Sequence, residues 1–244
     1  MTPQIAEFLK ACVISRLNIV VSGGTGSGKT TLLNVLSSMI PEDERVITIE
    51  DSAELQLGQP HVVRLEARPA DSDGTGAVSI RDLVKNSLRM RPERIVLGEI
   101  RGGEAIDMLQ AMNTGHEGSL TTIHANTPRD AMSRLENLVG LGGINLPSKA
   151  LRQLISSSVH FIVQVNRLND GSRKITSIQE ITGMEGDIIT TQEIFCYERT
   201  GTNTDGTVQG SFRATGIRPR VSEKFRTYGI GLSDGIFNPD AINA

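Results

Sequence analysis

The chain has 244 residues, enough for one large domain or for one domain with a small subdomain. Its formal net charge of -3 does not favour nucleic acid or an anionic membrane as a partner, since such partners select basic proteins. Cys12 and Cys196 are the two cysteines, and their wide separation argues against a disulfide framework and against a zinc site. Aromatic residues make up 3% and tryptophan is absent, so we expect an aliphatic core. The sequence has no signal peptide and no apolar run near the ~20 residues of a membrane helix, which predicts a cytoplasmic protein without a membrane span.

The predicted elements alternate between helix and strand through most of the chain. Thr2 and Pro3 begin a helix that extends to about Ser15, because a capping hydroxyl followed by proline is typical of a helix start. An apolar strand at 18–22, a glycine-rich turn and a helix from about Lys29 follow. Further strands are predicted at 45–50, 61–67, 94–100 and 118–124, and further helices at 79–90, 102–113, 127–139 and 146–157.

From residue 159 the pattern changes to four strands joined by turns that are rich in Asn, Asp and Gly. Alternating strands and helices imply a parallel sheet with helices on both faces, whereas strands joined by tight turns imply an antiparallel or mixed arrangement. We therefore predict an α/β fold. A mostly parallel sheet flanked by helices forms a core over residues 1–158, and residues 159–244 add a small β-rich extension of the same domain and a tail.

Residues 23–30, GGTGSGKT, match the phosphate-binding pattern G-x-x-x-x-G-K-[ST] in full, directly after an apolar strand and before a helix. Glycines allow the backbone to fold around an anion with its N–H groups pointing inward, and the following helix adds its positive end. The lysine reaches the β- and γ-phosphates, and the hydroxyl after it is offered to Mg²⁺. We therefore predict an ATP site formed by Gly23, Gly24, Thr25, Gly26, Ser27, Gly28, Lys29, Thr30 and Thr31.

Carboxylates follow two of the predicted strands. The strand at 94–98 ends in Glu99, a Walker-B-type arrangement, because open α/β sheets place their sites at the carboxyl ends of strands. Glu99 acts either on Mg²⁺ through water or on the attacking water. Glu50, Asp51 and Glu54 cluster at the end of the strand at 45–50, and we predict that Glu54 polarises the attacking water. Ordinary capping of the strand end is the alternative for this cluster.

Two histidines, His116 and His124, lie among glycines and threonines in the segment 112–128. Metal binding is disfavoured because no further ligands lie at metal-ligand spacing. His124 closes a strand that we place next to the Glu99 strand. Its imidazole is therefore predicted to donate to the γ-phosphate or to a catalytic group, and so to report whether ATP or ADP is bound. A structural histidine is the alternative at His124. For His116, in the turn before that strand, nucleotide contact and a structural role are equally supported.

Four arginines precede the Glu99 strand, and they are Arg81, Arg89, Arg91 and Arg94. One interpretation is that Arg89 or Arg91 contacts phosphate, either in its own subunit or in a neighbouring one. The other is that these arginines carry solvated surface charge, and the two interpretations are equally supported.

Four motifs occur in a fixed order, namely GGTGSGKT, EDSAEL, LRMRPERIVLGEIRGGEA and TGHEGSLTTIHANTP. In this order they resemble the secretion ATPase superfamily, which contains type II secretion and type IV pilus motors and the VirB-type type IV secretion ATPases. The resemblance is strongest to the CpaF/TadA branch, which drives Flp/Tad pilus assembly, and the segment FRATGIRPRVSEKF also resembles that branch. The resemblance implies a RecA-like P-loop core and a Mg²⁺-dependent ATPase. It also implies a homo-hexamer docked on inner-membrane platform proteins at their cytoplasmic side.

The resemblance also implies roles for individual residues. Glu54 matches the catalytic acid of the family's Asp box, and Glu99 matches its atypical Walker B motif. His116 and His124 match the His box. Arg101 lies in the segment GEIRG and is predicted to contribute to the nucleotide site, although several relatives have Asp where this chain has Gly102.

Family members carry an N-terminal domain that closes over the nucleotide and contributes arginines, whereas about twenty residues precede the P-loop here. The resemblance therefore predicts an isolated C-terminal motor domain without the family's N-terminal domain. Two alternatives to a motor remain at this stage. One is a nucleic-acid translocase on the same core, which the acidic charge and scarce aromatic residues disfavour. The other is a nucleotide-gated binding module with little turnover.

Overall fold

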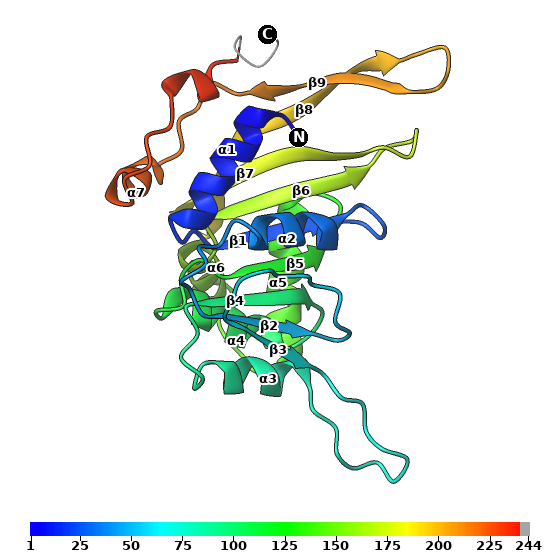
Figure 1. Cartoon of the computed structure of the whole chain (residues 1–244), viewed down its shortest axis with the longest axis vertical. Helices are drawn as coiled ribbons and strands as arrows, with labels where there is room; N and C mark the ends of the chain where they lie inside the picture. Colours follow the sequence, from blue (N-terminus) through cyan, green and yellow to red (C-terminus); the bar gives the residue numbers. More distant parts are fainter. Residues whose placement is uncertain (240–244) are drawn as a thin grey trace.

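The computed structural model describes residues 1–239 and contains a nine-stranded sheet flanked by helices (Figure 1). The strand order is β3-β2-β4-β5-β1-β6-β7-β8-β9. The strands are β1 (Ile19–Gly23), β2 (Val46–Glu50), β3 (Val62–Glu66), β4 (Arg94–Ile100), β5 (Leu120–His124), β6 (Phe161–Arg167), β7 (Arg173–Glu185), β8 (Ile188–Thr202) and β9 (Val208–Ala214). The helices are α1 (Pro3–Ile14), α2 (Lys29–Ser37), α3 (Ile80–Ser87), α4 (Glu104–Asn113), α5 (Pro128–Leu141), α6 (Ser148–Ser158), α7 (Ser222–Thr227) and the short 3-10 helix η1 (Asp234–Phe237).

Local capping explains where several helices begin. The Thr2 hydroxyl accepts a hydrogen bond from the Ile5 amide at the start of α1, and Thr127 does the same for Asp130 at the start of α5. Ser79 and Asp82 form the predicted capping box before α3. That helix ends at Ser87, earlier than expected, and the chain then turns toward β4. Within this turn Arg91, which precedes Pro92, has a φ of +54°, in the left-handed region, and the chain leaves the helical path.

The two faces of the sheet are covered by different helices. Along β1, Ile19 and Val21 pack into the cluster that contains α1 and α2, whereas Val20 packs into the cluster that contains α3 to α6. This alternation is the period of a strand that is buried on both faces. The core is largely aliphatic, as expected, with one local exception. Phe8 of α1 is surrounded by four other phenylalanine rings with centroids 5.2 to 6.1 Å away, and these are Phe161, Phe195, Phe225 and Phe237.

The β-rich extension continues the parallel sheet instead of forming a separate layer. β6 pairs in parallel with β1, and β7, β8 and β9 follow as antiparallel strands. The α/β fold with a mostly parallel sheet is therefore confirmed. The division into 1–158 and 159–244 stays a prediction, because strands of both parts share one sheet and residues 240–244 lie outside the described residues.

The segment after β9 folds back onto α1, as Figure 1 shows for α7 and η1. Phe225 and Phe237 bring this segment into the phenylalanine cluster. Its path is fixed by Glu180 of β7, whose buried carboxylate accepts hydrogen bonds from the amides of Arg220 (3.0 Å) and Val221 (2.9 Å). Within residues 1–239, none of the helices is both long enough and apolar enough to cross a membrane.

Candidate nucleotide site

Most of the predicted site residues collect at one edge of the sheet because β1, β2, β4 and β5 run parallel. Parallel strands present their carboxyl ends at the same edge, where open α/β sheets hold their ligands. Gly23 ends β1 and is the register partner of His124, which ends β5. Glu99 lies near the end of β4, and Glu54 lies in the loop that follows β2. β5 is the neighbour of β4, as we expected from the sequence.

The phosphate loop takes backbone shapes that its glycines permit. Gly26 and Gly28 have φ angles of +69° and +96°, in the left-handed region that L side chains rarely adopt. A Cβ atom at Gly23 would lie 2.4 Å from the Val165 carbonyl oxygen of β6, closer than real Cβ contacts allow. The cradle therefore requires glycine at these positions. The α2 helix begins directly after Gly28, so its positive end faces the loop.

Lys29 folds back over this loop. Its ammonium donates a hydrogen bond to the Gly24 carbonyl at 3.1 Å, and the Ser27 hydroxyl donates to the same carbonyl at 2.8 Å. Burial lowers the pKa of Lys29 from its ordinary value, the Glu99 carboxylate raises it, and Arg101 lowers it. The cation thus lies partly desolvated within the field of both groups, where an added phosphate would interact with it strongly.

A cavity of about 280 Å³ lies beside the P-loop residue Thr30. Its lining residues are Thr30, Glu50, Asp51, Ser52, Glu54, Gly98, Glu99 and Arg101. The structure thus brings together both predicted catalytic carboxylates, the predicted metal-binding hydroxyl and Arg101. Oxygen donors of the kind that Mg²⁺ takes, the Thr30 hydroxyl and the Glu99 carboxylate, meet in this cavity.

Glu50 positions the loop that carries Glu54, a function that sequence reasoning did not assign to it. Its largely buried carboxylate accepts hydrogen bonds from the amides of Glu54 and Leu55, both at 2.9 Å. Asn34 of α2 adds a second support, because its side chain accepts from the Gln56 amide at 2.8 Å. The Glu54 side chain itself is exposed, so a rigid backbone holds a free carboxylate at the cavity.

Gly98 explains the unusual IVLGE form of the second acidic motif. A Cβ atom at this position would approach the Glu50 side chain to 3.2 Å. Its carbonyl accepts a hydrogen bond from the Thr122 hydroxyl of β5 at 2.7 Å. A side chain at Gly98 would therefore push against the Glu50 side chain, whose carboxylate supports the Glu54 loop.

Arg101 holds two of the carboxylates together. Its guanidinium contacts Glu99 at 2.7 Å and Asp51 at 2.9 Å. The hydrogen bond to Glu99 raises the pKa of the Arg101 guanidinium. At 65% side-chain exposure this cation is mostly solvated, so it remains accessible to a ligand that enters the cavity.

Thr31 of the P-loop and His124 of the His box also lie at this edge. Thr31, in the first turn of α2, is exposed and adjacent to the cavity residue Thr30. The His124 imidazole is exposed beside Gly23 and has no hydrogen-bond partner among residues 1–239. An imidazole in this position is free to donate to a ligand in the cradle.

His116 lies at the opposite edge of the sheet from the P-loop. It precedes β5, and the full length of that strand, at ~3.3 Å per residue, separates it from the edge that carries His124. Its carbonyl accepts from the Ser119 hydroxyl at 2.7 Å, and burial lowers the pKa of its imidazole. The structure therefore does not bring His116 to the P-loop of its own chain, which favours the structural alternative for this residue.

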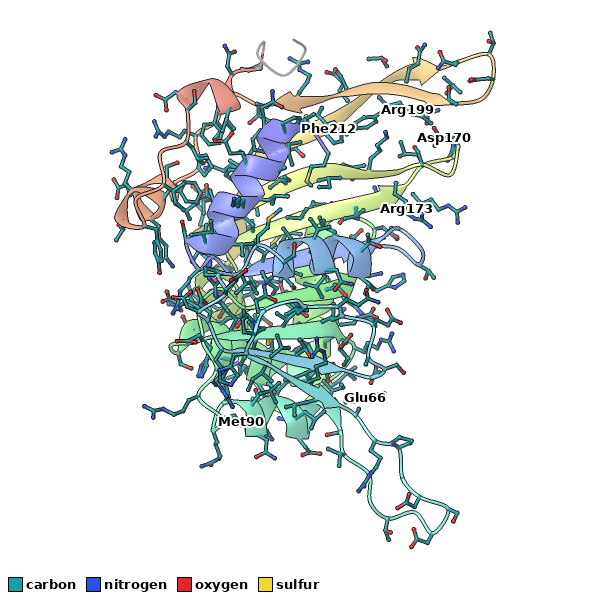
Figure 2. The ribbon with its side chains drawn as sticks, viewed as in Figure 1. Glu66, Met90, Asp170, Arg173, Arg199 and Phe212 are labelled. Atoms are coloured by element: carbon teal, nitrogen blue, oxygen red, sulfur yellow. The ribbon has the colours of Figure 1, made fainter. Side chains whose placement is uncertain are left out.

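Arg89 lies at that opposite edge as well. It follows α3, and its neighbour Met90 accepts a hydrogen bond from Arg45, which immediately precedes β2 (Figure 2). Arg89 therefore cannot reach the phosphates of its own P-loop, and contact with a neighbouring subunit stays a prediction. Arg94 is fully buried and forms a two-bond ion pair with Glu44, with one bond at 3.0 Å, which identifies it as structural.

Arg173 of β7 contacts the P-loop, which sequence reasoning missed. Its guanidinium Nε donates to the Gly26 carbonyl at 2.9 Å, across a separation of 147 residues. The turn at 169–171 predicts a hairpin at this point, but no local signal indicates that its first strand lies beside β1.

Comparisons with known proteins place this geometry in a family. The family described as type II/IV secretion system protein matches residues 1–217. A putative conjugal transfer protein of Mycobacterium tuberculosis is 43% identical over 186 residues, which cover 76% of this chain and 52% of the relative. The type IV secretion system protein VirB11 of Bartonella henselae is 42% identical over 173 residues, which cover 70% and 48%. The chain thus spans about half the length of the curated relatives it matches.

Solved structures agree on the fold. The VirB11 ATPase of the Brucella suis type IV secretion system aligns with a TM-score of 0.65 at 39% identity, over 71% of this chain and 51% of that chain. The pilus retraction motor PilT with bound ADP aligns with a TM-score of 0.55 at 20% identity, over 94% and 55%, and bears on the fold alone. These neighbours confirm the RecA-like P-loop core. From its match over residues 1–217 and its relatives, the chain belongs to the type II/IV secretion system protein family, within the secretion ATPase superfamily.

Proposed function

We propose that this chain hydrolyses ATP to ADP and phosphate as the motor domain of a secretion or conjugal transfer system. The observation that carries the proposal is the cavity beside the P-loop, in which Glu54 and Glu99 lie with Thr30. A P-loop alone binds nucleotide, whereas hydrolysis also needs a group that orients water. Relatives named as conjugal transfer and type IV secretion proteins support the same function.

In this mechanism the P-loop amides and Lys29 bind the β- and γ-phosphates. Lys29 exchanges its bond to the Gly24 carbonyl for phosphate oxygens, which gain more from a partly desolvated cation than a neutral carbonyl does. The γ-phosphate then faces the acidic cavity. Glu54 orients a water molecule and accepts its proton while the water oxygen bonds to the γ-phosphorus and the bond to the bridging oxygen breaks.

Thr30 and Glu99 are the residues that would hold Mg²⁺, through a hydroxyl and a water-mediated carboxylate contact. When bound, this ion neutralises charge on the phosphates. Among residues 1–239, no three His, Cys, Asp or Glu side chains are arranged to hold a metal ion, so phosphate and water would supply the other ligands.

The finer proposal is a homo-hexamer that powers Flp/Tad pilus assembly from the cytoplasmic side of inner-membrane platform proteins. It is supported by the order of the motifs and by the segment FRATGIRPRVSEKF. In cells that depend on this protein, Lys29→Ala is expected to abolish Flp-type pili and leave conjugal transfer intact. Loss of transfer with normal pili would assign the chain to a transfer apparatus instead.

Glu54→Gln tests the hydrolysis step directly. The variant is expected to bind ATP with wild-type affinity and to release phosphate about 10² to 10⁴ times more slowly, because a general base is lost without loss of a binding group. Glu66→Gln is the matched control, since Glu66 is an exposed glutamate at the same edge but outside the cavity (Figure 2). Calorimetric binding of ATP and a phosphate-release assay provide the two readouts.

Other outcomes of this experiment favour the alternatives. Equal turnover in Glu54→Gln and wild type would remove Glu54 from the mechanism. Tight ATP binding with negligible hydrolysis in the wild-type chain would identify a nucleotide-gated binding module. Turnover that single-stranded DNA stimulates would favour a nucleic-acid translocase.

His124→Ala tests the proposed γ-phosphate contact. We expect ATP affinity or turnover to fall by about tenfold, because a hydrogen bond to a charged group is lost, while ADP affinity stays unchanged. Calorimetric titration with ATP and with ADP, together with phosphate release, separates these effects. Wild-type values for both ATP affinity and turnover would contradict the sensor role.

A further inference from the structure

The β6–β7 hairpin brings an arginine onto the outer side of the P-loop. Arg173, the first residue of β7, donates from Nε to the Gly26 carbonyl, and its Cδ would lie 3.2 Å from a Cβ atom built at Gly28. Figure 2 shows Arg173 at the edge of the sheet where the P-loop lies. Nε is occupied by this bond, and the two terminal nitrogens of the guanidinium have no partner among residues 1–239.

A second arginine lies directly beside the first. Arg167 of β6 is the register partner of Arg173, so the two side chains project from the same face of the sheet. Like charges in this cross-strand position are destabilising unless an anion compensates them. Among residues 1–239 no acidic side chain forms an ion pair with either arginine. Asp170, in the turn between them, accepts instead from the Ser172 and Val208 amides at 2.9 and 2.8 Å.

The order of the strands gives this arginine pair a defined position relative to a bound nucleotide. The acidic cavity lies on the β4 side of β1, and the β6–β7 hairpin lies on the other side. In the proposed mechanism, water attacks the γ-phosphate from the acidic cavity, so that phosphate would face β4. The α- and β-phosphates would then lie toward β6 and β7.

We propose that Arg173, with Arg167 beside it, binds the α- and β-phosphates of the nucleotide on the side of the P-loop that faces away from the acids. The proposal rests on the proposed function of the P-loop and names two further binding residues for it. A guanidinium suits this position because it can hold the Gly26 carbonyl with one nitrogen and present two others to phosphate oxygens. The anion also removes the repulsion between the two arginines.

Calorimetric titration of the whole chain with ATP and with ADP tests this proposal. In Arg173→Gln the Kd for both nucleotides is expected to rise about tenfold. Arg167→Gln is expected to shift both Kd values in the same direction. Arg199→Gln is the matched control, because Arg199 is an exposed arginine of β8 that bonds the Thr202 hydroxyl, and it should bind as wild type does.

Thermal unfolding separates a binding role from a role in supporting the loop. If Arg173 binds phosphate, Arg173→Gln keeps the Tm of the nucleotide-free chain and loses much of the rise in Tm that ADP causes. A lower nucleotide-free Tm with an unchanged ADP-induced rise would mean that the arginine only supports Gly26, and would overturn the proposal. Weaker binding of ATP alone would also overturn it. Failure of the proposed function is a different result, in which wild type and Arg199→Gln bind neither nucleotide.

Discussion

Lys29→Ala is expected to abolish ATP hydrolysis by this chain and to weaken ATP binding by about 10- to 100-fold. The Lys29 ammonium is partly buried and is anchored to the Gly24 carbonyl at 3.1 Å, so it already lies where the phosphates would be held. Alanine removes the cation that neutralises the β- and γ-phosphates, and a hydrogen bond to a charged group in such a site is worth about 1.5 to 3 kcal/mol. Calorimetric binding and phosphate release are the measurements.

Lys149→Ala serves as the matched control for this prediction. Lys149 is an exposed lysine at the start of α6 and pairs with Asp187 on the surface. The same assays on this variant are expected to give wild-type values. If Lys29→Ala bound ATP as tightly as Lys149→Ala does, the assignment of residues 23–30 as the nucleotide site would fail.

Gly23→Ala is expected to lower the free energy of unfolding by about 1 to 3 kcal/mol and to abolish nucleotide binding. The new methyl group would lie 2.4 Å from the Val165 carbonyl oxygen and equally close to the Ser27 hydroxyl. The hydroxyl can rotate away, but the carbonyl belongs to β6, which pairs with β1 along its length. The strand or the loop must therefore move, and either movement distorts the phosphate cradle.

Gly24→Ala is the control for this substitution and differs from it by one position. Nothing lies within 4 Å of a Cβ atom built at Gly24, and the residue does not have a positive φ. Chemical denaturation and ATP titration of the two variants are therefore expected to diverge. Equal unfolding free energies would show that the sheet accommodates the methyl group and that the close approach of β6 does not constrain the loop.

The convergence of Glu54, Glu99 and His124 near the P-loop could be predicted from the sequence, because these residues follow a simple rule. The motif at 23–30 defines the phosphate loop, and parallel strands carry the residues that follow them to the same edge. Glu54, Glu99 and His124 each lie at or just after the carboxyl end of a strand, so their convergence needed no knowledge of long-range contacts. His116 precedes its strand, so the same rule places it at the opposite edge. A nucleotide contact is considered for it because it lies in the His-box motif, and not because of its position.

The residues that sequence reasoning missed depend on long-range pairing. In the sequence, Glu50 is one of several acids in a cluster. Its role in positioning the Glu54 loop follows only from the hydrogen bonds that it accepts from two backbone amides. Arg173 is separated from Gly26 by 147 residues, and Glu180 holds a segment that begins 40 residues later. Strand and turn patterns give each element, but they do not say that β6 lies next to β1 or that the chain returns to α1.

The continuous nine-stranded sheet limits how this domain can transmit force. Every strand from β3 to β9 is joined to the next by backbone hydrogen bonds, so separating or sliding the parallel and antiparallel halves would break a row of them. The sheet is therefore expected to move as one unit, and the candidate nucleotide site lies at the carboxyl edge of its parallel strands. If the whole sheet rotates by a small angle at the P-loop, β9 is displaced in proportion to its distance from that loop. If the chain acts as the proposed motor, the parallel and antiparallel parts of the sheet would move together, and work would be delivered at the ends of the sheet.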